Sequence, residues 1–165
     1  MISFEQALMI AKTEVDKPSM IPEGLTIQEE LIMELPYAWI FPYTSKLYAE
    51  TYDIKYAVGG NSPIFVSKSN GKISYYRSGL SLNDMIDEYE EENKYWQLIL
   101  SLDLSDISSW RTLKDVLNWS QSSLSQFKSS GSRLLDEGAR SRLTKIHTVL
   151  AIHKIDTEII LKSTI

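Results

Sequence analysis

The chain of 165 residues contains no cysteine and only two histidines, His147 and His153. The missing thiols exclude disulfides, cysteine nucleophiles and thiolate zinc sites. The two histidines lie six residues apart and no HExxH motif is present, so their spacing does not fit two ligands on one helical face. No stretch approaches the roughly 18–20 apolar residues of a spanning helix, and Glu5 and Gln6 interrupt the apolar start that a signal peptide needs. We expect a cytoplasmic protein that requires no metal or cofactor.

The composition is otherwise that of a globular protein, with 43% hydrophobic and 24% charged residues. The net charge of −5 opposes binding to phosphate backbones, so no nucleic-acid partner is expected. The charge is uneven, because residues 1–93 carry a net charge of −8 and residues 94–165 a net charge of +3. All nine tyrosines occur at or before Tyr95. This asymmetry predicts two domains, 1–93 and 94–165.

The first predicted domain begins with an amphipathic helix over residues 3–15, with Ser3 and Gln6 forming a capping box. After a proline-containing loop, alternating apolar residues predict four strands, at Leu25–Leu35, Tyr37–Tyr43, Pro63–Lys68 and Lys72–Arg77. Asn70-Gly71 is a hairpin signal, because both residue types tolerate a positive φ. A second helix is expected over Leu82–Asn93. The fold class is therefore α+β, with a helix, a four-stranded antiparallel sheet and a helix.

The second predicted domain is a small β-α-α-β-α-β unit. Its strands are expected at Tyr95–Leu102, Leu134–Leu135 and Asp156–Lys162, and its helices at Ser109–Trp119, Ser120–Lys128 and Ala139–Ile152. The many serines between residues 120 and 132 weaken the prediction of the middle helix, because serine competes for backbone hydrogen bonds.

Catalytic motifs are not apparent. Gly59-Gly60 lacks the spacing and the lysine of a phosphate-binding loop and is typical of a tight turn. The serines of residues 120–132 form no GxSxG or SxxK motif. The aromatic residues of the first domain could form a stacking platform for nucleic acid, but its acidity favours packing within the sheet. We expect that the protein is not an enzyme.

The acidic run at residues 87–92 is the most highly charged stretch of the chain. Such carboxylates could chelate a metal, but no calcium-loop pattern surrounds them. A solvated helix face is one interpretation, and a docking surface for a basic partner is the other, because dense negative charge speeds encounter with a positive protein. The candidate partner-binding residues are Asp87, Glu88, Glu91 and Glu92, together with Tyr52 and Asp53 at the turn that follows Tyr48-Ala49-Glu50-Thr51.

Residues 1–92 contain several recognisable segments: the Met-Ile-Ser-Phe-Glu-Gln-Ala start, the aromatic strand 39–43, the segment 48–53, the Gly-Asn-Ser-Pro-Ile-Phe-Val-Ser-Lys strand at 60–68 and the helix around residues 85–90. In these segments the chain resembles the immunity-protein-35 family of small bacterial proteins. The chain departs from the family where Tyr52 replaces the usual glycine. The resemblance implies a protein that binds a cognate toxin and blocks it without catalysis. A small holdase-like chaperone or adaptor is the alternative.

The second predicted domain has a pattern made of Trp96–Leu100, Leu113–Leu117, Gly138-Ala139 and Ile159–Leu161. In this pattern residues 94–165 are similar to the C-terminal domain of the ribosomal stalk protein. This similarity implies a compact protein-binding module and does not imply ribosome binding. Neither the identity of the toxin nor the oligomeric state follows from the sequence.

Overall fold

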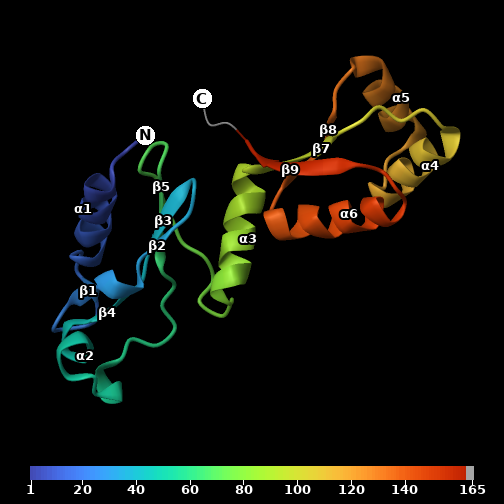
Figure 1. The fold of residues 1–165 in the computed structure, drawn as a ribbon. Helices are drawn as coiled ribbons and strands as arrows, with labels where there is room; N and C mark the ends of the chain where they lie inside the picture. The colour runs from blue at the N-terminus through green and yellow to red at the C-terminus, as the bar shows by residue number, and fades with distance from the viewer. Residues whose placement is uncertain (163–165) are drawn as a thin grey trace. The chain divides into compact units, whose positions relative to one another are not determined.

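The computed structural model describes residues 1–162 and has the predicted α+β fold (Figure 1). Its contacts divide the chain into two compact units, one ending at Ser81 and the other beginning at Leu82. The expected boundary followed residue 93, so the two divisions differ by one helix, α3 (Leu82–Asn93). Carboxylates of α3 bind the start of a later helix in the second unit, which explains why α3 is grouped there. The functional assignment of each domain stays a prediction.

The first unit begins with α1 (Phe4–Val15), whose start confirms the predicted capping box. The Ser3 hydroxyl accepts a hydrogen bond from the Gln6 amide, and the Gln6 side chain accepts one from the Ser3 amide. The helix buries a stripe of small and branched residues against the aromatic strands. This core consists of Ala7, Ala11, Val15, Ile27, Trp39, Phe41, Ile64 and Val66.

Two antiparallel sheets accompany α1. The four-stranded sheet has the order β2 (Met33–Glu34), β3 (Ala38–Phe41), β5 (Ile64–Ser67), β6 (Ile73–Ser74). The two-stranded sheet joins β1 (Leu25–Ile27) to β4 (Tyr43–Ser45). The Asn70-Gly71 hairpin between β5 and β6 is confirmed, although only Gly71 has a positive φ, of 72°.

The prediction of one continuous strand over Leu25–Leu35 was wrong. A 3₁₀ turn, η1 (Glu29–Leu31), separates β1 from β2, and the two strands belong to different sheets. The break is caused by Pro42, which lies in the neighbouring part of the chain that pairs with β1 and β2. Proline has no amide to donate, so Pro42 interrupts that partner strand between β3 and β4. Ile27 pairs with Tyr43, whereas Met33 pairs with Ile40, so η1 carries the chain from one sheet to the other.

The second unit confirms the predicted β-α-α-β-α-β order after α3. Its elements are β7 (Trp96–Leu100), α4 (Ile107–Val116), α5 (Gln121–Ser130), β8 (Leu134–Gly138), α6 (Arg140–Ile152) and β9 (Thr157–Leu161). The strands form an antiparallel sheet in the order β8-β7-β9. The serine-rich α5 forms because the Ser120 hydroxyl accepts from the Ser123 amide and Leu124 is buried.

The core of the second unit is aliphatic at its centre and aromatic at its margin. Its buried residues are Leu98, Leu100, Leu113, Leu135, Leu143, Leu150 and Ile155. The Phe127 ring of α5 lies 5.0 Å from Trp119 and 6.2 Å from Trp110, which fixes α5 against α4. Figure 1 shows α6 running alongside the three strands. Across residues 1–162, no helix combines the length and the apolar character that crossing a bilayer requires.

Candidate protein-binding surface

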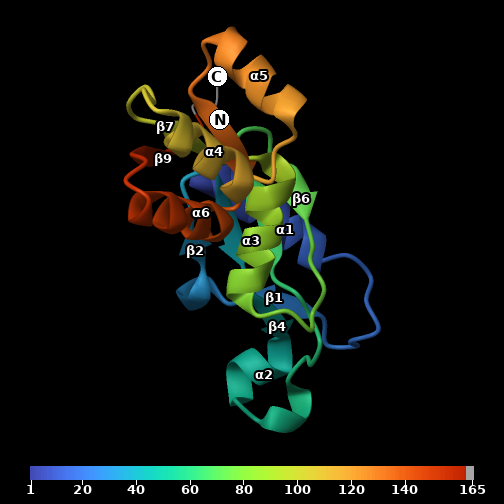
Figure 2. The same ribbon diagram turned by 90° about the vertical axis from the view of Figure 1, so that its right-hand side faces the viewer.

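The turn after β4 presents two large apolar side chains to solvent. It comprises α2 (Lys46–Thr51), Tyr52, Asp53 and a 3₁₀ turn, η2 (Ile54–Tyr56). Tyr52 and Ile54 are each 78% exposed. Both views show this segment projecting from the end of the first unit near β1 and β4 (Figures 1 and 2). We refer to residues 52–54 as the Tyr52–Ile54 loop.

A buried serine holds both ends of this segment. Ser45 is fully buried, and its hydroxyl accepts a hydrogen bond from the Tyr48 amide at 3.0 Å. The same hydroxyl donates to the carbonyl of Tyr56 at 2.6 Å and thereby links two residues that are eleven positions apart. The Thr51 hydroxyl adds a bond to the Leu47 carbonyl and accepts one from the Asp53 amide. The loop is therefore fixed before any partner arrives.

Tyr52 has a backbone conformation that favours glycine. Its φ of 56° and ψ of 16° lie in the left-handed region, where it ends α2. This conformation costs a residue with a Cβ roughly 1–2 kcal/mol. The turn therefore places a residue with a Cβ in a strained conformation. The Tyr48 ring is 6.3 Å from the Tyr52 ring and supports one edge of it.

Asp53, the other predicted partner residue of this turn, has a local structural role. Its carboxylate accepts from the Lys55 amide at 3.1 Å and pairs with the Lys55 ammonium at 2.9 Å. Lys55 also lies 4.7 Å from the centre of the Tyr56 ring. Asp53 thus orders the backbone that carries Tyr52 and Ile54, and any contact of Asp53 with a partner stays a prediction.

The acidic run on α3 lies in a setting that neither sequence-based interpretation included. Glu90 is 5% exposed, and its carboxylate accepts from the Arg140 amide at 2.7 Å and from the Trp96 indole at 2.7 Å. The Glu91 carboxylate accepts from the Ala139 amide at 2.8 Å. These two carboxylates satisfy free amides at the start of α6, where a negative charge is favourable.

Two further contacts complete this junction between α3 and α6. Asp87 accepts a hydrogen bond from the Ser141 hydroxyl at 2.6 Å. The Arg142 guanidinium binds the carboxylates of Glu91 and Asp136 and donates to the Glu137 carbonyl. Partial burial raises the pKa of Glu91, but hydrogen bonds from Lys94, the Ala139 amide and Arg142 outweigh this and lower it to about 2. Asp87 and Glu91 therefore have structural partners within the chain.

The remaining predicted residues of α3 are Glu88 and Glu92. Glu88 is half-buried, and Glu92 is exposed. Their role in partner binding stays a prediction. The sequence contained a signal of the α3–α6 junction, because the N-cap position of α6 is Ala139, which has no side-chain oxygen to cap the helix. Such an uncapped start indicates that acceptors come from elsewhere in the fold.

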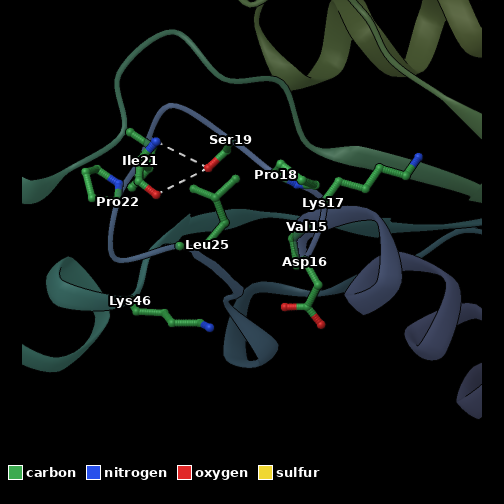
Figure 3. Close-up of a pocket in the computed structure, with 10 residues that line it drawn as sticks. Val15, Asp16, Lys17, Pro18, Ser19, Ile21, Pro22, Leu25 and Lys46 are labelled. Carbon is green, nitrogen blue, oxygen red and sulfur yellow. Dashed lines mark hydrogen bonds between the residues drawn. The ribbon is translucent and has the colours of Figure 1, made fainter.

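A small pocket opens between the end of α1 and the start of α2 (Figure 3). It has a volume of about 260 Å³ and is lined by the loop 17–24 and by Asp16 and Lys46, whose side chains approach it from opposite sides. The hydroxyl of Ser19 is already engaged with the backbone of Ile21. Because Asp16 is the one carboxylate among the lining residues and no histidine accompanies it, the pocket offers neither a carboxylate pair nor an activated nucleophile.

His147 lies within α6, and His153 directly follows the helix. The His147 imidazole hydrogen-bonds the Thr157 hydroxyl at 2.8 Å, which joins α6 to β9, and His153 is the C-cap of the helix. In the part of the chain that the structure describes, no three histidine, aspartate or glutamate side chains converge as metal ligands. His147 therefore has a structural role in joining α6 to β9, and His153 is exposed at the end of the helix.

We compared the chain with family models, curated proteins and solved structures. No family model, no curated protein and no solved structure matches this chain.

Proposed function

We propose that this chain is a bacterial immunity protein that binds a cognate toxin and blocks it sterically, with the Tyr52–Ile54 loop as the central contact. The observation that carries the proposal is the exposure of Tyr52 and Ile54 on a loop whose ends are tied by Ser45. The sequence resemblance of residues 1–92 supplies the class of partner.

The physical argument rests on how protein interfaces gain affinity. A few residues, enriched in tyrosine, contribute most of the binding free energy, and they lie at the centre of the contact. Ordering a flexible loop on binding reduces affinity, so a loop held in place beforehand binds more tightly. Tyr52 meets both conditions, because its ring is exposed while its backbone is fixed. Strained backbone positions also cluster at functional sites.

The experiment compares Tyr52→Gly with the wild-type protein. Glycine removes the ring and relieves the left-handed strain, so the folded protein should be equally stable or more stable by up to about 1 kcal/mol. Association with the toxin should nevertheless weaken by at least about tenfold, as for the loss of an interface tyrosine. Tyr48→Phe is the matched control, because it keeps the supporting ring. Unchanged affinity of the glycine variant would contradict the proposal.

A chaperone or adaptor role is the second candidate, and exposed methionines favour it. Met9 is 68% exposed and Met20 is 98% exposed. Methionine is flexible and common on surfaces that bind many partners. A chaperone should suppress the aggregation of unrelated proteins, whereas an immunity protein should act on one toxin at a 1:1 ratio. Light scattering of a heat-denatured unrelated enzyme distinguishes the two.

A further inference from the structure

The sheet of the second unit has one long edge that pairs with no other strand of residues 1–162. β9 pairs with β7 along its whole length without a register shift, and it is the last strand in the order β8-β7-β9. Native proteins usually protect such an edge with a proline, a bulge or a very short strand. β9 has five residues, Thr-Glu-Ile-Ile-Leu, and none of these protections. We refer to the side of β9 that faces away from β7 as the β9 edge.

The hydrogen bonds between β9 and β7 determine which backbone groups lie at the β9 edge. Backbone bonds to β7 are made by the even-numbered residues Asp156 and Lys162, one at each end of the strand. Because bonded residues alternate in an antiparallel pair, the even-numbered residues between them also bond to β7. The amides and carbonyls of Thr157, Ile159 and Leu161 therefore point away from the sheet. Within residues 1–162, these groups have no hydrogen-bond partner.

The other sheet edges are protected. The opposite edge of the same sheet is β8, which has a register shift against β7. The Glu137 amide points outward from β8, because its pairing partner Gln97 uses its backbone bonds for β9, and the Asp136 carboxylate accepts a bond from this amide. In the first unit, β2 and β6 have two residues each, and β1 and β4 have three each. The β9 edge is therefore the longest unprotected edge of the described strands.

β9 is complementary to a second copy of itself in the antiparallel direction. When Ile159 lies opposite Ile159 of the second copy, the outward amides and carbonyls of the two strands meet. This register also places Asp156 opposite Lys162 of the second copy at both ends, and opposite charges across an antiparallel pair stabilise it. Asp156 is exposed and has no ion-pair partner within residues 1–162. The Lys162 side chain contacts Glu137 but remains 48% exposed.

The same charges oppose pairing in the parallel direction. Parallel strands in register would place Asp156, Glu158 and Lys162 each beside its own copy, and like charges directly opposite are destabilising. Antiparallel pairing instead has a two-fold axis perpendicular to the sheet, so it closes as a dimer and does not continue as a filament. This axis keeps both copies of α6 on the same face of the joined sheet. The charge pattern of β9 therefore favours a second copy in one direction and one register.

The flank of α6 beside the β9 edge leaves room for the second copy. His147 bonds Thr157 of β9, whereas Arg142 on the other flank bonds residues of β8. Thr144 and Ala151 lie about one turn before and after His147 on the same flank, and both are exposed. Neither side chain is bulky or charged. The helix therefore places no obstacle beside the strand edge.

We infer that the protein forms a two-fold dimer in which the β9 edges of two copies pair in the antiparallel direction and join the two three-stranded sheets into one. The inference is independent of toxin binding, because the Tyr52–Ile54 loop lies in the other unit and supplies none of the pairing residues. Two short strands bury a small interface, so we expect a dissociation constant between about 1 µM and 1 mM.

The test combines sedimentation velocity of the full chain with amide exchange measured by NMR, both from about 1 µM to 1 mM. The sedimentation coefficient should rise with concentration to that of a dimer. Over the same range, exchange of the amides of Thr157, Ile159 and Leu161 should slow by at least about threefold, because pairing protects them. The amides of residues 158 and 160 are protected by β7 at every concentration and should change little. A monomer throughout, or slowing that does not distinguish these two sets, would overturn the inference.

Two variants and a control test the interface itself. Ile159→Pro removes an outward amide without removing a bond to β7, a position at which an edge strand accepts proline, and should weaken the dimer by at least about tenfold. Asp156→Lys places like charges opposite each other and should weaken it about three- to tenfold. Asp115→Lys makes the same change at an exposed position of α4 and should leave the dimer unchanged.

Melting temperatures of the dilute variants check that each one folds, and the charge variants decide the question if the proline variant does not. An undiminished dimer in Asp156→Lys, or an equal loss in Asp115→Lys, would also overturn the inference.

Discussion

Gly138 lies where β8 passes into α6, and its replacement by alanine tests the α3–α6 junction. Its φ is +152°, in a region that essentially only glycine occupies. A Cβ at this position would lie 2.1 Å from the Glu91 Oε2 atom and 2.5 Å from the Arg142 Nη2 atom. The Glu91 carboxylate would have to move away, and it would lose its hydrogen bonds to the Ala139 amide and to Arg142.

The expected cost has two parts. The backbone strain contributes about 1–3 kcal/mol, and the loss of a helix cap contributes about 0.5–2 kcal/mol. Gly138→Ala should therefore destabilise the second unit by about 2–4 kcal/mol, which for a domain of this size lowers the melting temperature by at least about 10 °C. Tryptophan fluorescence is a suitable signal, because Trp96, Trp110 and Trp119 all lie in this unit.

Two other glycines provide graded controls. Gly131 has a φ of +64°, but a Cβ there would meet nothing within 4 Å, so Gly131→Ala should cost only the conformational strain, about 1–2 kcal/mol. Gly79 has neither a left-handed φ nor a neighbour within 4 Å, so Gly79→Ala should be nearly neutral. If Gly138→Ala is no more destabilising than Gly131→Ala, the carboxylate of Glu91 does not cap α6.

The carboxylates of α3 and the hydroxyl of Ser45, which supports the Tyr52–Ile54 loop, give three further predictions. Because the pKa of Glu91 is lowered to about 2, its stabilisation is complete above its ordinary pKa and disappears as the pH falls from about 5 to 2. The difference in melting temperature between the wild type and Glu91→Gln should therefore shrink over that range, and a constant difference would contradict this. Ser45→Ala should lower the free energy of unfolding by about 1–3 kcal/mol, because it leaves the carbonyl of Tyr56 without its donor. Proteolysis after Lys55 should also become faster in this variant. An unchanged cleavage rate would refute the role of Ser45 in holding the loop. Charge reversal of Glu88 and Glu92 should slow association with a basic partner, more so at low salt, and salt-independent kinetics in stopped flow would exclude electrostatic steering by α3.

Local patterns in the sequence predicted most of the fold. The capping box of Ser3 and Gln6, the Asn70-Gly71 hairpin and the element order after residue 94 depend on neighbours in the chain, and all three are confirmed. The strand Leu25–Leu35 failed because its break is imposed by Pro42, which lies opposite in space. No periodic pattern marks the six residues of α2, which depend on the bonds of Ser45.

The candidate site was predictable only in part, because it too depends on contacts between residues far apart in the sequence. Tyr52 could be named from the sequence, but its exposure and left-handed backbone required the fold. The carboxylates of Glu90 and Glu91 reach amides about fifty residues away, and helix patterns carry no information about such a contact. A charged run on a helix therefore suggested a solvated or docking face, whereas part of it completes the start of α6.

We propose that the protein acts by presenting the Tyr52–Ile54 loop to one toxin. The most direct measurement is calorimetric titration of the wild type and of the double variant Tyr52→Gly with Ile54→Ser into a candidate toxin domain taken from the reading frame next to the gene of this chain. The account predicts 1:1 binding by the wild type and a loss of at least about a hundredfold in affinity for the double variant, as expected when two central interface residues are removed. No binding by the wild type, or equal binding by both proteins, would contradict it.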